Sequence, residues 1–119
     1  GHGVGSVLCV HEEGVRLSPK GEGEMHKNVI TSDEPGFYKA GEFGIRIENM
    51  LLCTANEENV LNFCNLTLVP IDVRAINVQL LSEGERIWIN NYHNRIKNEL
   101  KDKLSADEYL WLNDRFYEI

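Results

Sequence analysis

The stretch Gly41-Glu42-Phe43-Gly44-Ile45-Arg46-Ile47-Glu48-Asn49 decides the fold class of the first part of this 119-residue chain. Within it, two isoleucines alternate with Arg46 and Glu48. A period of two predicts a β-strand, with the isoleucines on one face and the charged side chains on the other. The strand is predicted to run from Phe43 to Cys53. A carboxylate in so apolar a strand is costly unless a cation neutralises it, so Glu48 is expected to pair with Arg46 or to bind a metal ion.

Short apolar runs on both sides of this stretch predict the other strands of a curved antiparallel sheet from residues 3 to 69. These runs are Val4–Val10, Asn28–Ser32, Val60–Phe63 and Leu66–Val69. Pro35-Gly36 follows one of them and is a turn signal. Residues 11–27 are rich in Gly, Glu and Lys and are predicted to form a loop, and residues 54–59 a hairpin connection.

The last third of the chain changes to helical periodicity. Two capping boxes, Ser82 with Glu85 and Ser105 with Glu108, predict helix starts, because the Ser side chain binds a free backbone N–H and the Glu reaches back. The first helix is predicted over residues 83–103, since apolar residues recur there every four positions. They are Trp88, Tyr92, Ile96, Leu100 and Leu104. Three aromatic residues could lie in the core or in a dimer face: Trp88, Tyr92 and Trp111. Their helical spacing favours the core. The fold class is therefore α+β, a sheet followed by a helical hairpin.

Composition narrows the function classes. The chain has 12 Lys and Arg against 19 Asp and Glu, a net charge of −7, and 42% hydrophobic residues. This balance is typical of a globular domain and argues against nucleic acid or an anionic membrane as the main partner. The chain begins without Met or a signal peptide, and we expect a piece of a longer, cytoplasmic protein. Two of the three cysteines, Cys9 and Cys53, lie in apolar runs and are expected to be buried thiols.

Four residues stand out for their chemistry: His2, His11, Glu34 and Glu48. One imidazole and two carboxylates from separate strands would make a mixed nitrogen and oxygen site for a divalent metal ion. Three ligands leave such a site open, as catalysis requires, but hold the metal poorly unless others arrive. Taken residue by residue, the alternatives are a surface pair of Glu48 with Arg46, a turn residue at Glu34, a mobile His2 and a solvated His11.

Three ordered motifs resemble the second half of an Xaa-Pro aminopeptidase (aminopeptidase P). They are Gly1–Ser6 followed by Val10-His11-Glu12, then Thr31–Tyr38, then Gly41–Asn49. This family belongs to the pita-bread metallopeptidases, with prolidase, methionine aminopeptidase and creatinase. Leu66–Ile71 and Trp88–His93 resemble the C-terminal extension of the long, cytosolic-type members. The resemblance implies that residues 1–64 are the C-terminal half of a pita-bread catalytic domain and residues 65–119 that extension.

The resemblance also implies a site with two divalent metal ions, usually Mn²⁺, with Zn²⁺ or Co²⁺ as alternatives. His2, Glu34 and Glu48 match three of the metal ligands, and Glu48 matches the one that bridges both ions. His11 matches the catalytic histidine that contacts the substrate and helps to stabilise the tetrahedral intermediate. Arg46 would orient a carboxylate. Two cations would lower the pKa of a shared water, and a catalytic Glu, assigned to Glu34, would pass its proton to the proline nitrogen.

The implied parent is a metallo-aminopeptidase that removes the N-terminal residue from peptides with proline at position two. Half of such a fold leaves apolar sheet surface that the missing half would cover, so a homodimer or larger oligomer is expected. The family places two Asp ligands upstream of Gly1, so the 119 residues alone are expected to be inactive. One alternative is prolidase or a creatinase-like hydrolase on the same fold; the C-terminal extension favours the aminopeptidase. Another is a non-catalytic pita-bread domain that binds proteins, which the three metal-ligand matches disfavour.

Overall fold

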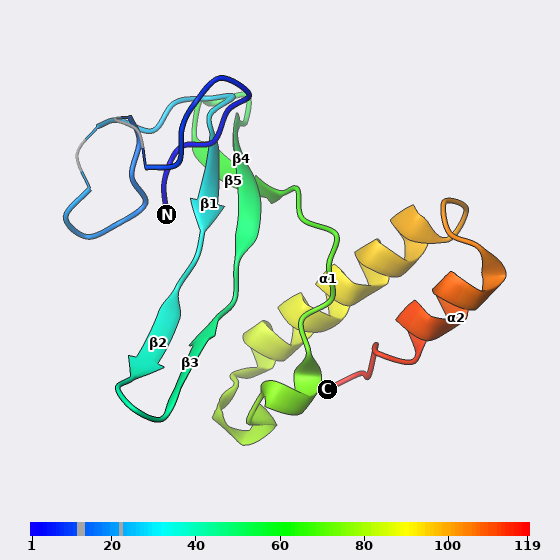
Figure 1. The fold of residues 1–119 in the computed structure, drawn as a ribbon. Coiled ribbons are helices and arrows are strands. Elements are labelled where there is room, and N and C mark those ends of the chain that lie inside the picture. Colours follow the sequence, from blue (N-terminus) through cyan, green and yellow to red (C-terminus); the bar gives the residue numbers. More distant parts are fainter. Residues whose placement is uncertain (12–13, 22) are drawn as a thin grey trace. The chain divides into compact units, whose positions relative to one another are not determined.

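The computed structural model describes residues 1–11, 14–21 and 23–119, which form two compact units. The N-terminal unit, Gly1–Thr67, contains the strands, and the C-terminal unit, Leu68–Ile119, contains the helices (Figure 1). The domain boundary that the sequence suggested, between residues 64 and 65, lies near this division. None of the helices in the described residues is long and apolar enough to cross a membrane.

The N-terminal unit has two antiparallel sheets. The three-stranded sheet has the order β1-β4-β5, with β1 at Ile30–Asp33, β4 at Asn49–Ala55 and β5 at Leu61–Asn65. The two-stranded sheet pairs β2, Gly36–Lys39, with β3, Phe43–Arg46. The strand predicted from Phe43 to Cys53 is therefore divided in two, with Ile47 and Glu48 between the parts.

The two sheets are parts of one long hairpin that is interrupted in both arms at the same level (Figure 1). On one side of the interruption Asp33 lies opposite Asn49, and on the other side Gly36 lies opposite Arg46. Pro35 contributes to the interruption because it has no N–H to donate to a ladder. The register is the same on both sides, so Glu34 lies opposite Glu48. The interruption thus brings two carboxylates to one place.

Three expectations about strands and burial before Pro70 were wrong. Val4–Val10 forms no strand: Gly3 makes one bridge to Thr31, and the chain then turns. Leu66–Val69 is likewise not a strand. Cys53 is fully buried as expected, but Cys9 is exposed. The reason for Cys9 is that its segment does not pack, as the 90% exposure of the Val7 side chain shows.

The C-terminal unit begins with two short 3-10 helices and continues with an α-helical hairpin. The helices are η1 at Val73–Ala75, η2 at Val78–Leu80, α1 at Glu83–Leu100 and α2 at Ala106–Asn113. Both predicted capping boxes are confirmed, with Ser82 and Ser105 as the N-caps. Helix α1 ends at Leu100, three residues earlier than predicted. The core consists of Tyr92, Ile96, Leu112 and Phe116, with Leu68, Ile71, Leu100 and Leu104 around it.

The predicted core position is confirmed for Tyr92 and is wrong for Trp88 and Trp111, which are about half exposed. The reason is helical geometry: a step of four residues advances about 40° beyond a full turn, so a row of such steps drifts around the helix. Trp88 therefore lies at the edge of the buried face, where it stacks on Tyr92. Trp111 lies under the guanidinium of Arg115, 3.6 Å from the ring centroid.

His93 on α1 is a buried polar residue of the C-terminal unit, with 3% of its surface exposed. Its Nε2 accepts a hydrogen bond of 3.1 Å from the backbone N–H of Ile71. Protonation would remove this acceptor. Burial of the ring, together with the nearby charge of Lys97, lowers the pKa of His93 below its ordinary value of 6.5.

This shift predicts that the C-terminal unit loses stability as the pH falls below about 6.5. The unfolded chain then takes up a proton that the folded unit resists, which costs at most about 1.4 kcal/mol per pH unit. Above that pH both states hold a neutral His93, and its contribution to stability is complete. Both tryptophans, Trp88 and Trp111, belong to this unit, so fluorescence-detected urea unfolding at pH 7.5 and 5.5 measures it separately.

The variant His93→Gln does not titrate and should show a smaller difference between the two pH values than the wild type. His26→Gln, at an exposed histidine of the other unit, should behave like the wild type. An unchanged pH dependence in His93→Gln would contradict the role given to this side chain.

Candidate metal centre

The N-terminal segment brings His2 against strand β1. The carbonyl oxygen of His2 accepts two hydrogen bonds of 2.9 Å, from the backbone N–H of Ser32 and from Thr31 Oγ1. A Cβ at Gly1 would lie only 1.7 Å from the carbonyl oxygen of Ser32, so this approach requires glycine. Thr31 and Ser32 are almost completely buried. The position of His2 is therefore determined by its backbone.

The imidazole of His2 faces Glu34. Its Nδ1 lies 3.0 Å from the carbonyl oxygen of Gly3, and since a carbonyl only accepts, Nδ1 carries the proton of the neutral ring. Nε2 then presents a lone pair, 3.6 Å from Oε1 of Glu34. Both side chains are only 18% exposed. In the neutral ring, no proton lies between Nε2 of His2 and the carboxylate oxygen of Glu34. Two electron-pair donors so close together are suited to binding one cation between them.

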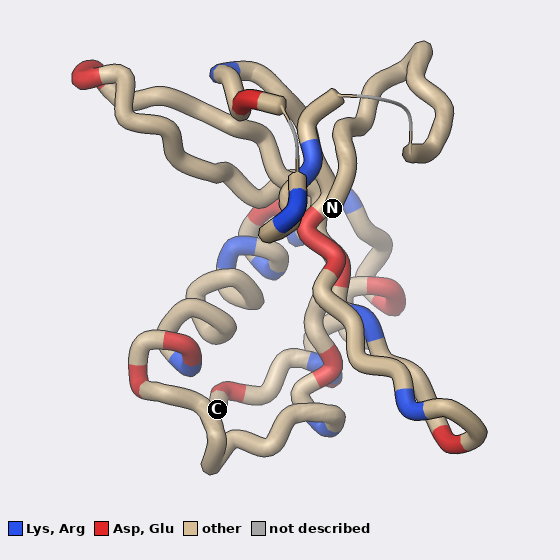
Figure 2. Tube along the Cα trace, turned by 90° about the vertical axis from the view of Figure 1, so that its left-hand side faces the viewer, with Lys and Arg blue, Asp and Glu red and all other residues tan. Residues whose placement is uncertain are grey.

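Arg46 links the two glutamates that face each other across the interrupted hairpin. Its Nη1 lies 3.4 Å from Oε2 of Glu34, and its Nε lies 3.5 Å from Oε2 of Glu48. Like charges opposite each other in a strand pair repel, and the guanidinium between them offsets this repulsion. Figure 2 shows charged positions of both signs along this hairpin. Lys39 and Glu42 of the hairpin form an ion pair of 2.7 Å.

His11 completes the group of predicted residues. Its ring meets that of His2 edge to face, with 5.0 Å between the ring centroids. The backbone of His11 has a φ of 63°, in the left-handed region that few residues other than glycine adopt. A strained backbone angle is typical of residues that are held for a function. The four residues that stand out in the sequence thus form one connected group together with Arg46.

The donor atoms fit a divalent metal ion chemically, although the arrangement is incomplete. Imidazole nitrogen and carboxylate oxygen are ligands of Mn²⁺, Zn²⁺ and Co²⁺. In the part of the chain that the structure describes, no group of three or more His, Cys, Asp or Glu side chains is arranged to hold a metal ion. Arg46, itself a cation, pairs with both Glu34 and Glu48. His2 and Glu34 converge, and Glu48 is held by the guanidinium.

Sequence reasoning missed Ser32, which touches both His2 and Glu34. The backbone N–H of His2 donates to Ser32 Oγ over 3.0 Å, and Ser32 Oγ lies 3.2 Å from Oε1 of Glu34. The signal was present in the spacing: residues two apart on an extended chain share a face.

Family models match almost the whole chain. Residues 1–55 match the model of metallopeptidase family M24, and residues 59–119 match the model of the C-terminal region of peptidase M24. The chain belongs to metallopeptidase family M24. Within this M24 chain, the residues of the candidate metal centre all lie in the part that matches the first model.

Curated relatives and a solved structure agree with this assignment. An Xaa-Pro aminopeptidase of Caenorhabditis elegans is 41% identical over 94% of the chain, and aminopeptidase P1 of Arabidopsis thaliana is 35% identical over 94%. The crystal structure of an X-prolyl aminopeptidase from C. elegans, described as a cytosolic enzyme with a di-nuclear active site, superposes with a TM-score of 0.82 at 37% identity. It covers 99% of this chain. The predicted fold class, part of a pita-bread fold with a C-terminal helical hairpin, is confirmed.

The M24 chain spans about a fifth of the length of its relatives: 20% of the C. elegans protein, 19% of the Arabidopsis protein and 21% of the solved chain. The predicted resemblance to aminopeptidase P, with its C-terminal region, is confirmed by the family models and these relatives.

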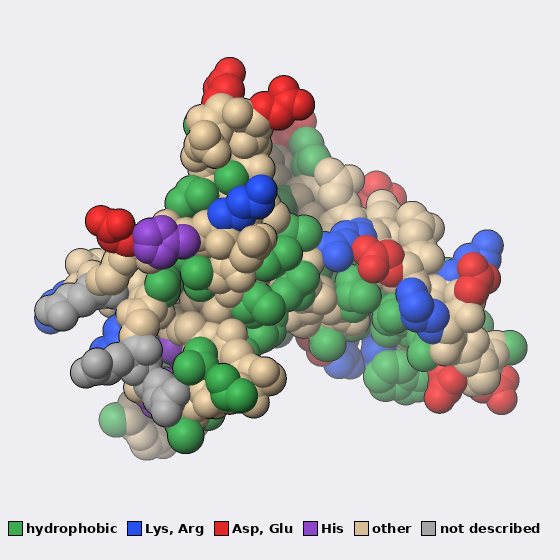
Figure 3. Space-filling model, turned by 90° about the horizontal axis from the view of Figure 1, so that it is seen from above, with side chains coloured by type: hydrophobic (Ala, Val, Ile, Leu, Met, Phe, Trp, Pro, Cys, Tyr) green, Lys and Arg blue, Asp and Glu red, His purple; other side chains and the backbone are tan. Residues whose placement is uncertain are grey.

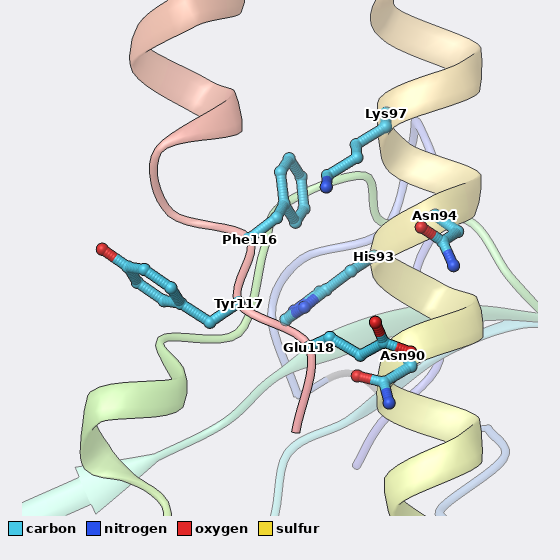
Figure 4. A pocket seen from close by; sticks show the side chains of 7 residues that line it. All are labelled: Asn90, His93, Asn94, Lys97, Phe116, Tyr117 and Glu118. Atoms are coloured by element: carbon cyan, nitrogen blue, oxygen red, sulfur yellow. The ribbon is translucent and has the colours of Figure 1, made fainter.

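A separate cavity lies in the C-terminal unit, between α1 and the end of the chain (Figure 4). Its volume is about 300 Å³, and it is lined by Asn90, His93, Asn94, Lys97, Phe116, Tyr117 and Glu118. Asn90 closes one side by two hydrogen bonds to the backbone of Ile119. His93 faces Phe116 with its ring edge and is covered from solvent, so it serves the packing of this unit.

Proposed function

We propose that the whole protein to which this chain belongs is an Xaa-Pro aminopeptidase, which removes the N-terminal residue from peptides with proline at position two. The observation that carries the proposal is the juxtaposition of Glu34 and Glu48 across the interrupted hairpin, with the lone pair of His2 facing Glu34. The names of the relatives support the substrate class.

We further propose that His2, Glu34 and Glu48 hold two divalent metal ions, with Mn²⁺ as the natural metal and Glu48 as the ligand of both. The resemblance assigns the remaining ligands to two aspartates outside these 119 residues. The ions would supply a water molecule with a pKa low enough to make it a nucleophile near neutral pH.

The residues of this chain would then bind, orient and transfer protons. Glu34 would take up a proton at a carboxylate oxygen and deliver it to the proline nitrogen as the peptide bond breaks. His11, at an exposed position beside His2, would contact the substrate and stabilise the tetrahedral carbon centre. Arg46, within 3.5 Å of both glutamates, would keep their carboxylates in fixed orientations.

Peptide cleavage by the full-length protein tests this function. With Mn²⁺ present, it should release the first residue of a peptide with proline at position two and leave the same peptide with alanine at that position intact. Preference for a two-residue Xaa-Pro substrate would identify a prolidase instead, and cleavage of creatine a creatinase-like enzyme. If the protein hydrolyses neither the longer Xaa-Pro peptide, nor the two-residue substrate, nor creatine, a protein-binding role is favoured and the proposal is contradicted.

We also propose that the protein is cytoplasmic and forms a homodimer. Apolar side chains of the N-terminal unit reach the surface in groups (Figure 3). On the β2–β3 hairpin, Phe37, Phe43 and Ile45 are 59%, 56% and 43% exposed. These three share one face of the hairpin, because Phe37 lies opposite Ile45 and Phe43 is two residues from Ile45. An apolar face of this kind tends to find a partner.

The 119-residue chain is therefore expected to sediment as a dimer or larger oligomer at high micromolar concentration. Ile45→Ser should shift it toward monomer, because the substitution removes apolar area from this face. Tyr38→Ser changes the opposite face of the same hairpin and serves as the control. A clean monomer of the unmodified chain in analytical ultracentrifugation would count against association through this surface.

A further inference from the structure

The hydroxyl of Ser32 lies between two of the proposed metal ligands. Ser32 is the third residue of β1 and is 1% exposed. Three groups surround its oxygen: the backbone N–H of His2 at 3.0 Å, Oε1 of Glu34 at 3.2 Å and the carbonyl oxygen of His2 at 3.5 Å. Oε1 of Glu34 is the same oxygen that faces the imidazole of His2.

The roles of these hydrogen bonds follow from counting donors and acceptors. A hydroxyl has one proton to donate, and a carbonyl oxygen has two lone pairs. The carbonyl of His2 already accepts two bonds of 2.9 Å, from Ser32 N–H and from Thr31 Oγ1. The hydroxyl proton of Ser32 therefore goes to Oε1 of Glu34, while its oxygen accepts from His2 N–H. The chain of bonds runs from His2 through Ser32 to Glu34.

We propose that Ser32 is a positioning residue of the metal centre, whose hydroxyl sets Glu34 and His2 in fixed positions relative to each other. The proposal rests on the proposed function and adds a residue to it. Because Ser32 is buried and bonded on both sides, its hydroxyl cannot rotate away without leaving a polar group unpaired. Glu34 Oε1 is thereby restricted on the side of Ser32, which leaves its other lone pair for a cation that it would share with Nε2 of His2, 3.6 Å away.

The test uses the full-length protein and measures Mn²⁺ binding by calorimetry, at a temperature where every variant is folded. Ser32→Ala should raise the dissociation constant for Mn²⁺ by about 10- to 100-fold, as loss of a partner of a metal ligand typically does. The kcat for an Xaa-Pro peptide should fall, whereas KM should change little, since Ser32 is 1% exposed and so is not placed to touch a substrate.

Three further variants separate positioning from general stability. Ser32→Thr keeps the hydroxyl and should retain the Mn²⁺ affinity of the wild type within about threefold. This change is smaller than the roughly 10- to 100-fold loss expected when the hydroxyl is removed. Ser18→Ala removes a serine hydroxyl that binds a backbone N–H in an exposed turn of the same unit, and should change nothing. If Ser32→Ala does not fold, Ser32→Cys provides a side chain of similar size with a much weaker hydrogen bond.

Each outcome has a defined meaning. Wild-type Mn²⁺ affinity in Ser32→Ala, or in Ser32→Cys in its place, overturns the positioning role while the proposed function stands. Equal losses in Ser32→Thr and Ser32→Ala also overturn it, because the hydroxyl would then not matter. If the wild-type protein neither binds Mn²⁺ nor cleaves an Xaa-Pro peptide, the proposed function fails and the role of Ser32 fails with it.

Discussion

Replacement of Glu48 by alanine in the full-length protein is expected to abolish Xaa-Pro peptide cleavage and to lower kcat by more than about 10³-fold. This loss exceeds the roughly 10- to 100-fold that is typical when a hydrogen-bond partner of a metal ligand is removed. Glu48 lies opposite Glu34 across the interrupted hairpin and is the proposed ligand of both metal ions. Its loss would remove one bond from each ion and the single negative charge that the two ions would share. Initial rates with saturating Mn²⁺ measure the effect, and calorimetry measures the accompanying loss of metal.

The same substitution should scarcely affect folding. The Glu48 side chain is 43% exposed, and its contact with Arg46 is a partly exposed ion pair of 3.5 Å. Such a pair contributes at most about 1 kcal/mol to the free energy of unfolding. Glu42→Ala is the matched control, since Glu42 is an exposed glutamate of the β2–β3 hairpin that pairs with Lys39 over 2.7 Å. Full activity of Glu48→Ala would overturn the ligand assignment.

The isolated 119 residues are expected to bind at most one Mn²⁺ ion, weakly, and to show no detectable cleavage of an Xaa-Pro peptide. They supply three of the proposed ligands, and the described residues hold no group of three arranged for a metal ion. A hard divalent ion that prefers about six oxygen-rich ligands would fill its other positions with water.

Titration with Mn²⁺ under calorimetry, in parallel with the full-length protein, measures this difference. Residual binding by the isolated chain should vanish in His2→Ala and persist in His26→Ala, because His26 is an exposed histidine of the same unit. Manganese-dependent release of the N-terminal residue by the isolated chain at a rate near that of the full-length protein would show that these residues suffice for catalysis.

Much of the C-terminal unit was predictable because its determinants are local. Each capping box depends on two residues three positions apart, and both formed where the sequence indicated. The error at Trp88 arose because the apolar residues recur every four positions, whereas the helix turns every 3.6. Which side of that drifting row is buried depends on Leu112 and Phe116, which lie in a different segment.

The N-terminal unit was less predictable because strands depend on distant partners. An apolar run such as Val4–Val10 becomes a strand only where another strand pairs with it, and here the isolated bridges of the segment are at His2 and Gly3, just before the run. Likewise, the interruption of the hairpin depends on both Pro35 in one arm and the segment Ile47-Glu48 in the other. The alternation in the opening motif correctly predicted strands but could not indicate where they would be divided.

The sequence by itself determined the identity of the chemical groups: one imidazole, two carboxylates and a guanidinium in motifs that resemble one metallopeptidase family. It also determined which groups share a strand face, since that follows from a period of two. Only the tertiary structure decided that Glu34 lies opposite Glu48, that Arg46 lies within 3.5 Å of both, and that Ser32 joins His2 to Glu34. The physical reason is that register and contacts between segments far apart in the chain are set by the pairing of whole strands.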